Sequence, residues 1–317
     1  MPLMEVLLTD IAGYIPAGRI DNLTRLTELE TNEEFLRTKI GTTSVARKAD
    51  TEETSDLCVR AFERLASQSG IAAADLDCIA LVTQNPDGAG IPHTSAVVHG
   101  KLGAREDCAV FDLSLACSGF VYGLSLMQSF MEAQRFNTGV LFTCDPYSKV
   151  IDPNDRNTAL LFGDAATATL LRASRPGLSG WKPGPFRFAT RGSGGEAIQN
   201  PNRLLSMDGR AVFNFSATAL PEQIRAVAKD ANLEFSDIDL FVFHQGSKFI
   251  VDTLTKRLGL PEARVPLAIE NVGNTISSSI PLAFAPYIAD RALRNVLISG
   301  FGGGLSWATG LLTRVDG

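Results

Sequence analysis

One cysteine stands where a thiol could do chemistry. Cys117 follows the apolar run at 109–113 and precedes a helix that we expect over 118–134. A thiol in the first turn of a helix faces the positive end of the helix dipole, which lowers its pKa and favours the thiolate. The other four cysteines, at 58, 78, 108 and 144, lie within apolar patterns typical of packed, unreactive cysteines. The sequence therefore indicates Cys117 as a nucleophile.

The sequence has only three histidines, and one of them ends a predicted strand. His244 follows the apolar run at 240–243. Side chains at the carboxyl ends of strands face the crevice in which α/β sheets place ligands. Position alone leaves open a core histidine bonded to a backbone carbonyl. His93 and His99 lie in a polar segment with Gly and Pro, which favours a non-catalytic role for both.

A turn asparagine and a glycine run complete the candidate groups. Asn274 lies in a Gly-Asn-Thr turn. Such asparagines are usually structural, but one near a histidine can donate to a developing oxyanion. The glycines at 302–304 offer unobstructed backbone N–H groups, and the Lys-Ser/Thr of a phosphate loop does not follow them. Cysteine, histidine and asparagine together indicate acyl transfer through a thioester. Papain-like hydrolysis uses the same residue types, but a duplicated α/β pattern disfavours it.

The elements that must hold these groups alternate between strand and helix. Apolar runs predict strands at 78–83, 109–113, 139–143, 165–171, 240–243, 296–299 and 307–312. Helical patterns occupy 54–68, 118–134, 220–231 and 248–258. The alternation predicts α/β layers in two similar halves, joined by a Gly- and Pro-rich loop at 173–203. Uncharged stretches at 113–131, 272–289 and 295–313 contain serines, prolines or glycines, which favours a buried core over membrane spans.

Composition bounds the class of protein. The chain has 317 residues, 45% hydrophobic and 20% charged, which is enough for a large core and excludes a disordered protein. A net charge of −6 argues against nucleic acid or an anionic membrane as the main partner. The five cysteines contain no CxxC pair, so we expect neither a disulfide framework nor a metal site. We expect no signal peptide, and a cytoplasmic location.

Several of these groups fall into motifs that occur in a recognisable order. The motifs are residues 115–120 (Leu-Ala-Cys-Ser-Gly-Phe), Phe162-Gly163-Asp164-Ala165, His244-Gln245, Gly273-Asn274-Thr275 with Pro281, and Phe301-Gly302-Gly303-Gly304. In order and spacing they resemble the β-ketoacyl-acyl-carrier-protein synthase III family of the thiolase superfamily, over essentially the whole chain. The resemblance implies a thiolase-like five-layer α/β/α/β/α fold, with halves at 1–172 and 173–317, and a homodimer.

The resemblance also implies a chemistry. It is that of a condensing acyltransferase of fatty acid biosynthesis, which needs no cofactor beyond its substrates, acyl-CoA and a malonyl thioester on acyl carrier protein. Cys117 takes the acyl group as a thioester, and decarboxylative Claisen condensation extends it to a β-ketoacyl thioester. The resemblance assigns His244 and Asn274 to donate hydrogen bonds that stabilise the enolate formed when CO₂ is lost. The backbone N–H groups of Cys117 and Gly303 are assigned to the oxyanion hole.

The remaining site residues are likewise carried over from the family. Coenzyme A is expected against Phe35, Lys39, Arg156 and Ser247, Ile91 closes the acyl pocket across the dimer, and the carrier docks on Lys248, Lys256 and Arg257. The family usually has Trp at the place of Phe35 and basic residues at the places of Phe249 and Asn214. These departures leave open an acyltransferase of a specialised pathway that serves another acceptor. An inactive partner subunit is disfavoured because the three catalytic candidates are intact.

Overall fold

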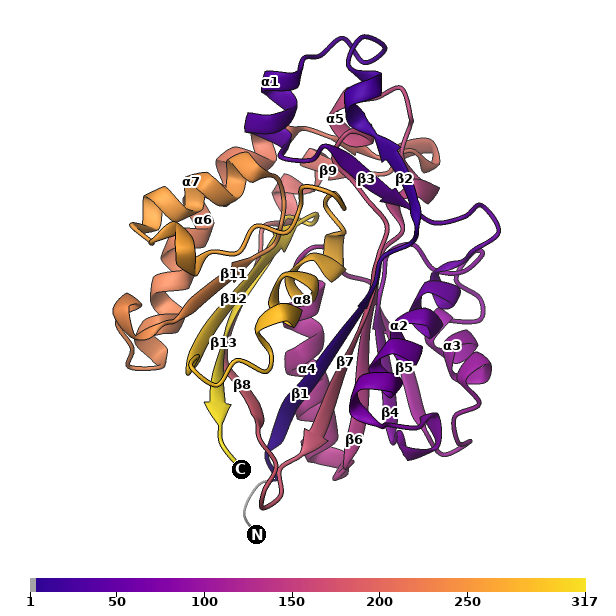
Figure 1. The fold of residues 1–317 in the computed structure, drawn as a ribbon, viewed down its shortest axis with the longest axis vertical. Helices are drawn as coiled ribbons and strands as arrows, with labels where there is room; N and C mark the ends of the chain where they lie inside the picture. Colours follow the sequence, from indigo (N-terminus) through magenta and orange to yellow (C-terminus); the bar gives the residue numbers. More distant parts are fainter. Residues whose placement is uncertain (1–3) are drawn as a thin grey trace.

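A computed structural model describes residues 4–317. Its centre is a nine-stranded sheet with the order β11-β12-β13-β8-β1-β7-β6-β4-β5 (Figure 1). The first half of the chain supplies β1 (Val6–Tyr14), β4 (Cys78–Val82), β5 (Ala109–Leu113), β6 (Thr138–Cys144) and β7 (Ala166–Ala173). The second half supplies β8 (Gly180–Thr190), β11 (Leu240–Phe243), β12 (Asn295–Gly302) and β13 (Ser306–Val315).

The two halves of the sheet repeat one pattern. In the first, β4 runs parallel to β6, and β7 and β1 follow antiparallel. In the second, β11 runs parallel to β12, and β13 and β8 follow antiparallel. The halves join where Leu8 pairs with Trp181. Because of this repetition we propose residues 1–172 and 173–317 as the two structural halves.

Helices cover the sheet and fill the space between its halves. They are α1 (Glu33–Phe35), α2 (Thr54–Ser69), α3 (Thr94–Leu102), α4 (Gly119–Gln134), α5 (Arg156–Ala159), α6 (Gly209–Asp230), α7 (Lys248–Leu258) and α8 (Ser279–Phe284). A cap beside the carboxyl ends of the strands holds α1, α5 and two short ribbons, β2 (Gly18–Asp21) with β3 (Ser44–Arg47) and β9 (Ile198–Gln199) with β10 (Ser206–Met207).

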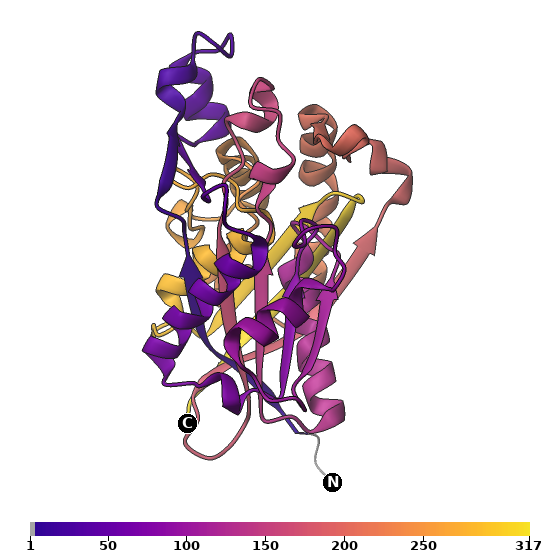
Figure 2. The same ribbon diagram turned by 90° about the vertical axis from the view of Figure 1, so that its right-hand side faces the viewer.

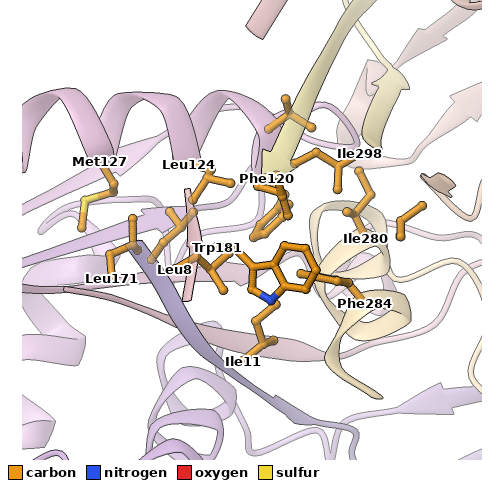
Figure 3. Close-up of a cluster of buried hydrophobic side chains, with 14 of the residues drawn as sticks. Leu8, Ile11, Phe120, Leu124, Met127, Leu171, Trp181, Ile280, Phe284 and Ile298 are labelled. Atoms are coloured by element: carbon orange, nitrogen blue, oxygen red, sulfur yellow. The ribbon is translucent and has the colours of Figure 1, made fainter. Parts of the chain in front are cut away.

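Three apolar cores separate the layers. The central core lies where α4 and α8 pack between the two half-sheets, around Phe120, Trp181, Ile280 and Phe284 (Figure 3). A second core lies between the first half-sheet and α2 and α3, and a third between the second half-sheet and α6 and α7. Figure 2 shows the ribbon from the side, with helices on the outer faces of the sheet. This arrangement confirms the predicted five-layer α/β/α/β/α fold. Over the described residues, no helix is long and apolar enough to cross a membrane.

Two predictions about individual elements were wrong, and one strand was missed. The predicted loop at 173–203 contains β8, an eleven-residue strand, because pairing with β13 holds its backbone despite the prolines, and a register shift accommodates them. The helix predicted at 220–231 begins at Gly209, where the Asp208 side chain accepts the N–H groups of Arg210 and Ala211. Strand β1, at the centre of the sheet, was not predicted.

Candidate active site

Cys117 lies in the turn between β5 and α4, two residues before the helix begins. It is 8% exposed. The turn is packed against β12 so closely that two strand positions must be glycine. A Cβ added at Gly300 would lie 2.5 Å from the Cys117 carbonyl oxygen, and one added at Gly302 would lie 2.9 Å from Sγ. The glycine run was interpreted from sequence only as a source of N–H groups. Its role in admitting the cysteine appears only in the fold.

His244 leaves the carboxyl end of β11 and is buried. Its Nδ1 is hydrogen-bonded to Ser279 Oγ at 2.7 Å, and the same hydroxyl accepts the backbone N–H of Gln245 at 3.3 Å. Because a hydroxyl can donate or accept, Ser279 allows the imidazole to present either a lone pair or an N–H at Nε2. Ser279 was not singled out from sequence.

Asn274 brings its amide to the same point. Its Nδ2 lies 3.4 Å from His244 Nε2 and donates to the Gly246 carbonyl at 3.4 Å. Its Oδ1 accepts the backbone N–H of Ile276 at 2.9 Å, which fixes the amide with its N–H₂ group toward the histidine. The two side chains therefore present their nitrogen atoms side by side.

The three candidate groups meet in one cavity of about 380 Å³, called here the main cavity. Cys117, His244 and Asn274 line it together with Gly302 and a largely apolar wall. The structure thus brings together residues that lie up to 157 positions apart in sequence (117 to 274). A buried thiol, an imidazole and an amide facing one apolar space form a water-poor site for acyl chemistry.

Burial of Cys117 opposes the thiolate that its position at the helix start was expected to favour. Burial raises the pKa of the Cys117 thiol above its usual value, and the carboxylate of Asp145 raises it further, while the backbone N–H of Cys117 opposes them. Burial also lowers the pKa of His244 to about 3, so the imidazole is neutral near pH 7. Burial therefore favours the neutral form of both the Cys117 thiol and the His244 imidazole.

Asp145 is a site residue that the sequence analysis missed. It follows the buried strand β6 and is itself fully buried. Its oxygens accept the Gln84 backbone N–H at 2.6 Å and the Ser277 hydroxyl at 2.5 Å, and burial raises its pKa to about 6. The sequence analysis considered the uncharged stretches around the catalytic candidates, and Asp145 lies outside them. An acidic residue directly after a buried strand would nevertheless have indicated a functional position.

Three of the four residues expected to hold coenzyme A line the main cavity, and one does not. Phe35, Lys39 and Ser247 line the main cavity, and Lys39 Nζ lies 3.7 Å from the centre of the Phe249 ring. Ser247 also caps α7, because its hydroxyl accepts the N–H of Ile250 at 3.3 Å. Arg156, in α5, donates to the Glu30 carbonyl at 3.2 Å and is not among the residues that line the main cavity.

The expected docking cations on α7 are mostly engaged within the protein. Lys248 pairs with Asp252 at 2.5 Å, and Arg257 donates to the Ala217 carbonyl at 2.8 Å. Lys256 is exposed. Phe249 stacks on Phe213, with ring centres 4.8 Å apart, and both rings line the main cavity.

Gly303 and Ile91 lie outside the main cavity. Gly303 lines a second, neighbouring cavity of about 320 Å³. Ile91 is 93% exposed, far more than is usual for an isoleucine. Among residues 4–317, no group of three His, Cys, Asp or Glu side chains is arranged to hold a metal ion.

Comparison with known proteins decides the family. Models of 3-oxoacyl-[acyl-carrier-protein (ACP)] synthase III match residues 111–192, and of its C-terminal part residues 228–314. β-Ketoacyl-[acyl-carrier-protein] synthase III 1 of Bacillus cereus is 34% identical over 307 residues, which covers 96% of this chain and 97% of that protein. The chain belongs to the 3-oxoacyl-acyl-carrier-protein synthase III family.

Solved structures agree with this assignment. The synthase III of Thermus thermophilus superposes with a TM-score of 0.90 at 30% identity, covering 98% of this chain and 99% of the other. The priming β-ketosynthase of the R1128 polyketide biosynthetic pathway superposes at 0.88 with 28% identity, covering 100% and 98%. This synthase III family member is therefore a condensing acyltransferase, which takes up an acyl group as a thioester and condenses it with a malonyl thioester with loss of CO₂.

Proposed function

We propose that Cys117 is the acylated nucleophile and that His244 and Asn274 act on the malonyl substrate. The convergence of these three side chains on one buried cavity carries the proposal. In the first half-reaction, Sγ attacks the thioester carbonyl of acyl-CoA and the CoA sulfur leaves. The thiol proton ends on that sulfur, so the acyl-cysteine and free CoA thiol are the products of this half-reaction. The backbone N–H groups of Cys117 and Gly303 stabilise the tetrahedral oxyanion.

In the second half-reaction, a malonyl thioester on acyl carrier protein replaces CoA in the main cavity. Its carboxylate leaves as CO₂, and the electron pair forms an enolate whose oxygen accepts hydrogen bonds from His244 and Asn274. The enolate carbon then attacks the acyl-cysteine carbonyl, and the Cys117 sulfur leaves as a thiolate while a β-ketoacyl thioester forms. Uptake of one proton from solvent returns that thiolate to the thiol. The reaction needs no metal ion or redox cofactor, because a thiol and neutral donors carry every step.

The outer part of the main cavity supports coenzyme A as the acyl donor. Phe35 offers an exposed ring at the mouth, and Lys39 offers a cation near it for a phosphate. Arg156 does not line the main cavity. We propose that it contacts the adenine ring of coenzyme A, and only its position in the family pattern supports this. The exposed Ile91 supports a homodimer in which it closes the partner's acyl pocket. Five free cysteines support a cytoplasmic location.

An acceptor other than an ordinary carrier protein is the second candidate. Phe213 and Phe249 stack on each other in the lining of the main cavity, Lys248 forms a surface pair with Asp252, and Arg257 donates to the Ala217 carbonyl. An acidic carrier therefore finds fewer available cations than the resemblance implies. This feature favours a specialised acyltransferase without changing the roles of Cys117, His244 and Asn274.

The half-reactions can be separated by single-turnover kinetics. Intact-mass analysis with acyl-CoA should show one acyl group, and peptide mapping should place it on Cys117; Cys117→Ala should remain folded and unacylated. His244→Ala and Asn274→Ala should slow condensation by about 10²–10³-fold, and more than they slow acylation. Acylation of Cys108 or Cys144, or equal loss in both half-reactions, would contradict the proposed roles.

A further inference from the structure

Asp145 is buried close to the nucleophile, and the proposed mechanism gives it no role. Its carboxyl group is fully buried directly after the carboxyl end of β6. Tyr147, two residues further on, packs in one apolar cluster with Cys117. A buried carboxylate is costly unless other groups compensate its charge. A position that holds one beside a reacting thiol therefore calls for a reason.

The two oxygens of this carboxylate join segments that lie far apart in sequence. One oxygen accepts the Gln84 backbone N–H at 2.6 Å, and the other accepts the Ser277 hydroxyl at 2.5 Å. The Thr83 hydroxyl and the Ser277 backbone N–H also stabilise the charged form. All four donors are neutral, so the charge of Asp145 is held by hydrogen bonds from two different parts of the chain.

The Gln84 side of this tie reaches the turn between β5 and α4, which carries the nucleophile. The N–H of Thr83 donates to the Leu113 carbonyl at the end of β5, at 3.1 Å. Val82, at the end of β4, packs so closely on the start of α4 that a Cβ added at Gly119 would overlap its Cγ1. The end of β4 is therefore a wall against which the nucleophile turn rests.

The Ser277 side of the tie reaches the turn that carries Asn274. Between the two residues, the backbone N–H of Ile276 holds the Asn274 amide oxygen at 2.9 Å. Ile276 has a φ of 53°, a left-handed conformation that a β-branched residue rarely adopts. Such a backbone persists only where its surroundings hold it. The bond from Ser277 to Asp145 is one of the contacts that do so, one residue further along.

The charge of Asp145 also acts on the nucleophile. Burial and this carboxylate both raise the pKa of the Cys117 thiol above its usual value. Other titratable side chains around Asp145 come from its own segment, from α2 and from the segment before β7, and they are Tyr147, Cys144, Cys58 and Asp164. None of these four carries a positive charge that would offset the effect of the carboxylate.

We propose that Asp145 is a positioning residue of the condensation: its oxygens fix the turn with Asn274 relative to the nucleophile, and its negative charge disfavours the thiolate of unacylated Cys117. The inference rests on the proposed roles of Cys117 and Asn274. A thiol that stays protonated between reactions is less exposed to alkylation and oxidation. The same charge favours proton uptake by the thiolate that is released when the β-ketoacyl thioester forms.

The charge is tested by alkylation of Cys117 with iodoacetamide, which reacts with the thiolate and needs no acyl donor. Asp145→Asn is nearly isosteric, because its amide oxygen can accept the Gln84 N–H while its NH₂ group donates to the Ser277 hydroxyl. A change of one in pKa alters the thiolate fraction tenfold, so we expect alkylation of Cys117 near pH 9 to be about tenfold faster in Asp145→Asn than in the parent. Intact mass and peptide mapping give the rate and the site.

Asp164→Asn is the matched control. Asp164 is also fully buried and also accepts two hydrogen bonds, from the backbone N–H groups of Lys48 and Ser148. The carboxylate that raises the pKa of the Cys117 thiol is that of Asp145, so Asp164→Asn should be alkylated at the parent rate. Equal acceleration in the two variants, or none in Asp145→Asn, overturns the electrostatic role.

Ser277→Ala tests the tie while keeping the charge, and it carries the test if Asp145→Asn does not fold. Because Asn274 serves only the malonyl step, we expect condensation to slow about tenfold more than acylation by acyl-CoA in single-turnover measurements. Equal loss in both half-reactions, or loss in neither, overturns the positioning role. Failure of the parent to acylate Cys117 instead refutes the proposed function, which the alkylation measurement does not depend on.

Discussion

Gly302 offers a sharp test of how the nucleophile is held. A Cβ added there lies 2.8 Å from Cys117 Cβ and 2.9 Å from Sγ. Non-bonded heavy atoms prefer separations of about 3.5–4.0 Å, so Gly302→Ala must displace the thiol or β12 by roughly 0.7 Å or more. A misplacement near 1 Å costs about 10²-fold in rate. We therefore expect acylation of Cys117 to fall by about 10- to 10²-fold, and overpacking to lower the free energy of unfolding by about 1–3 kcal/mol.

Single-turnover acylation by acyl-CoA, read by intact mass, gives the rate, and urea unfolding gives the stability. Gly303→Ala is the matched comparison, because its added Cβ meets Ile198 at 3.7 Å, an ordinary contact, and the backbone N–H is retained. We expect that variant to acylate close to the parent rate. Parent-like acylation by Gly302→Ala, or an equal loss in the two variants, would refute the idea that close approach of β12 positions the thiol.

Three other perturbations follow from the same geometry. Because the folded-state pKa of His244 is about 3 and its unfolded value 6.5, the unfolded state binds the extra proton, and stability falls as the pH drops below 6.5. Between pH 8 and pH 5, protonation of this group in the unfolded state lowers the free energy of unfolding by about 2 kcal/mol. Chemical unfolding of His244→Gln should therefore show a decrease between these pH values that is smaller than the parent's by about that amount. Asp145, whose pKa is raised to about 6, has the opposite effect: its protonation stabilises the folded state as the pH drops. This contribution is present in both the parent and His244→Gln. Phe249→Arg should raise turnover with carrier-bound malonyl by up to about fivefold at low salt, the value of one exposed ion pair near 1 kcal/mol. Because Phe249 also lines the main cavity beneath Lys39, single-turnover acylation by acyl-CoA is measured separately and divided out; unaltered carrier-dependent turnover would contradict the docking argument. Light scattering at micromolar concentration should give a dimer, and Ile91→Glu should weaken it; a monomeric parent would count against the role of Ile91.

The sequence was sufficient for the features that depend on local pattern. Strand β5 and helix α7 begin and end as predicted, because their apolar periodicity and their end signals are contained within the segments themselves. The position of Cys117 at a strand-to-helix junction, and of His244 at a strand end, could also be inferred from neighbours in the chain. Those positions, with the order of the motifs, were enough to indicate thioester chemistry and the layered fold.

Tertiary structure decided what depends on distance and on exclusion of water. Strand β8 exists because β13 pairs with it, a partner more than a hundred residues away that no local pattern reveals. The protonation state of Cys117 follows from burial and from Asp145, and burial outweighs the favourable helix start that the sequence does show. Local propensity is encoded along the chain, whereas electrostatics and specificity arise from the residues that folding brings together and from the water it removes.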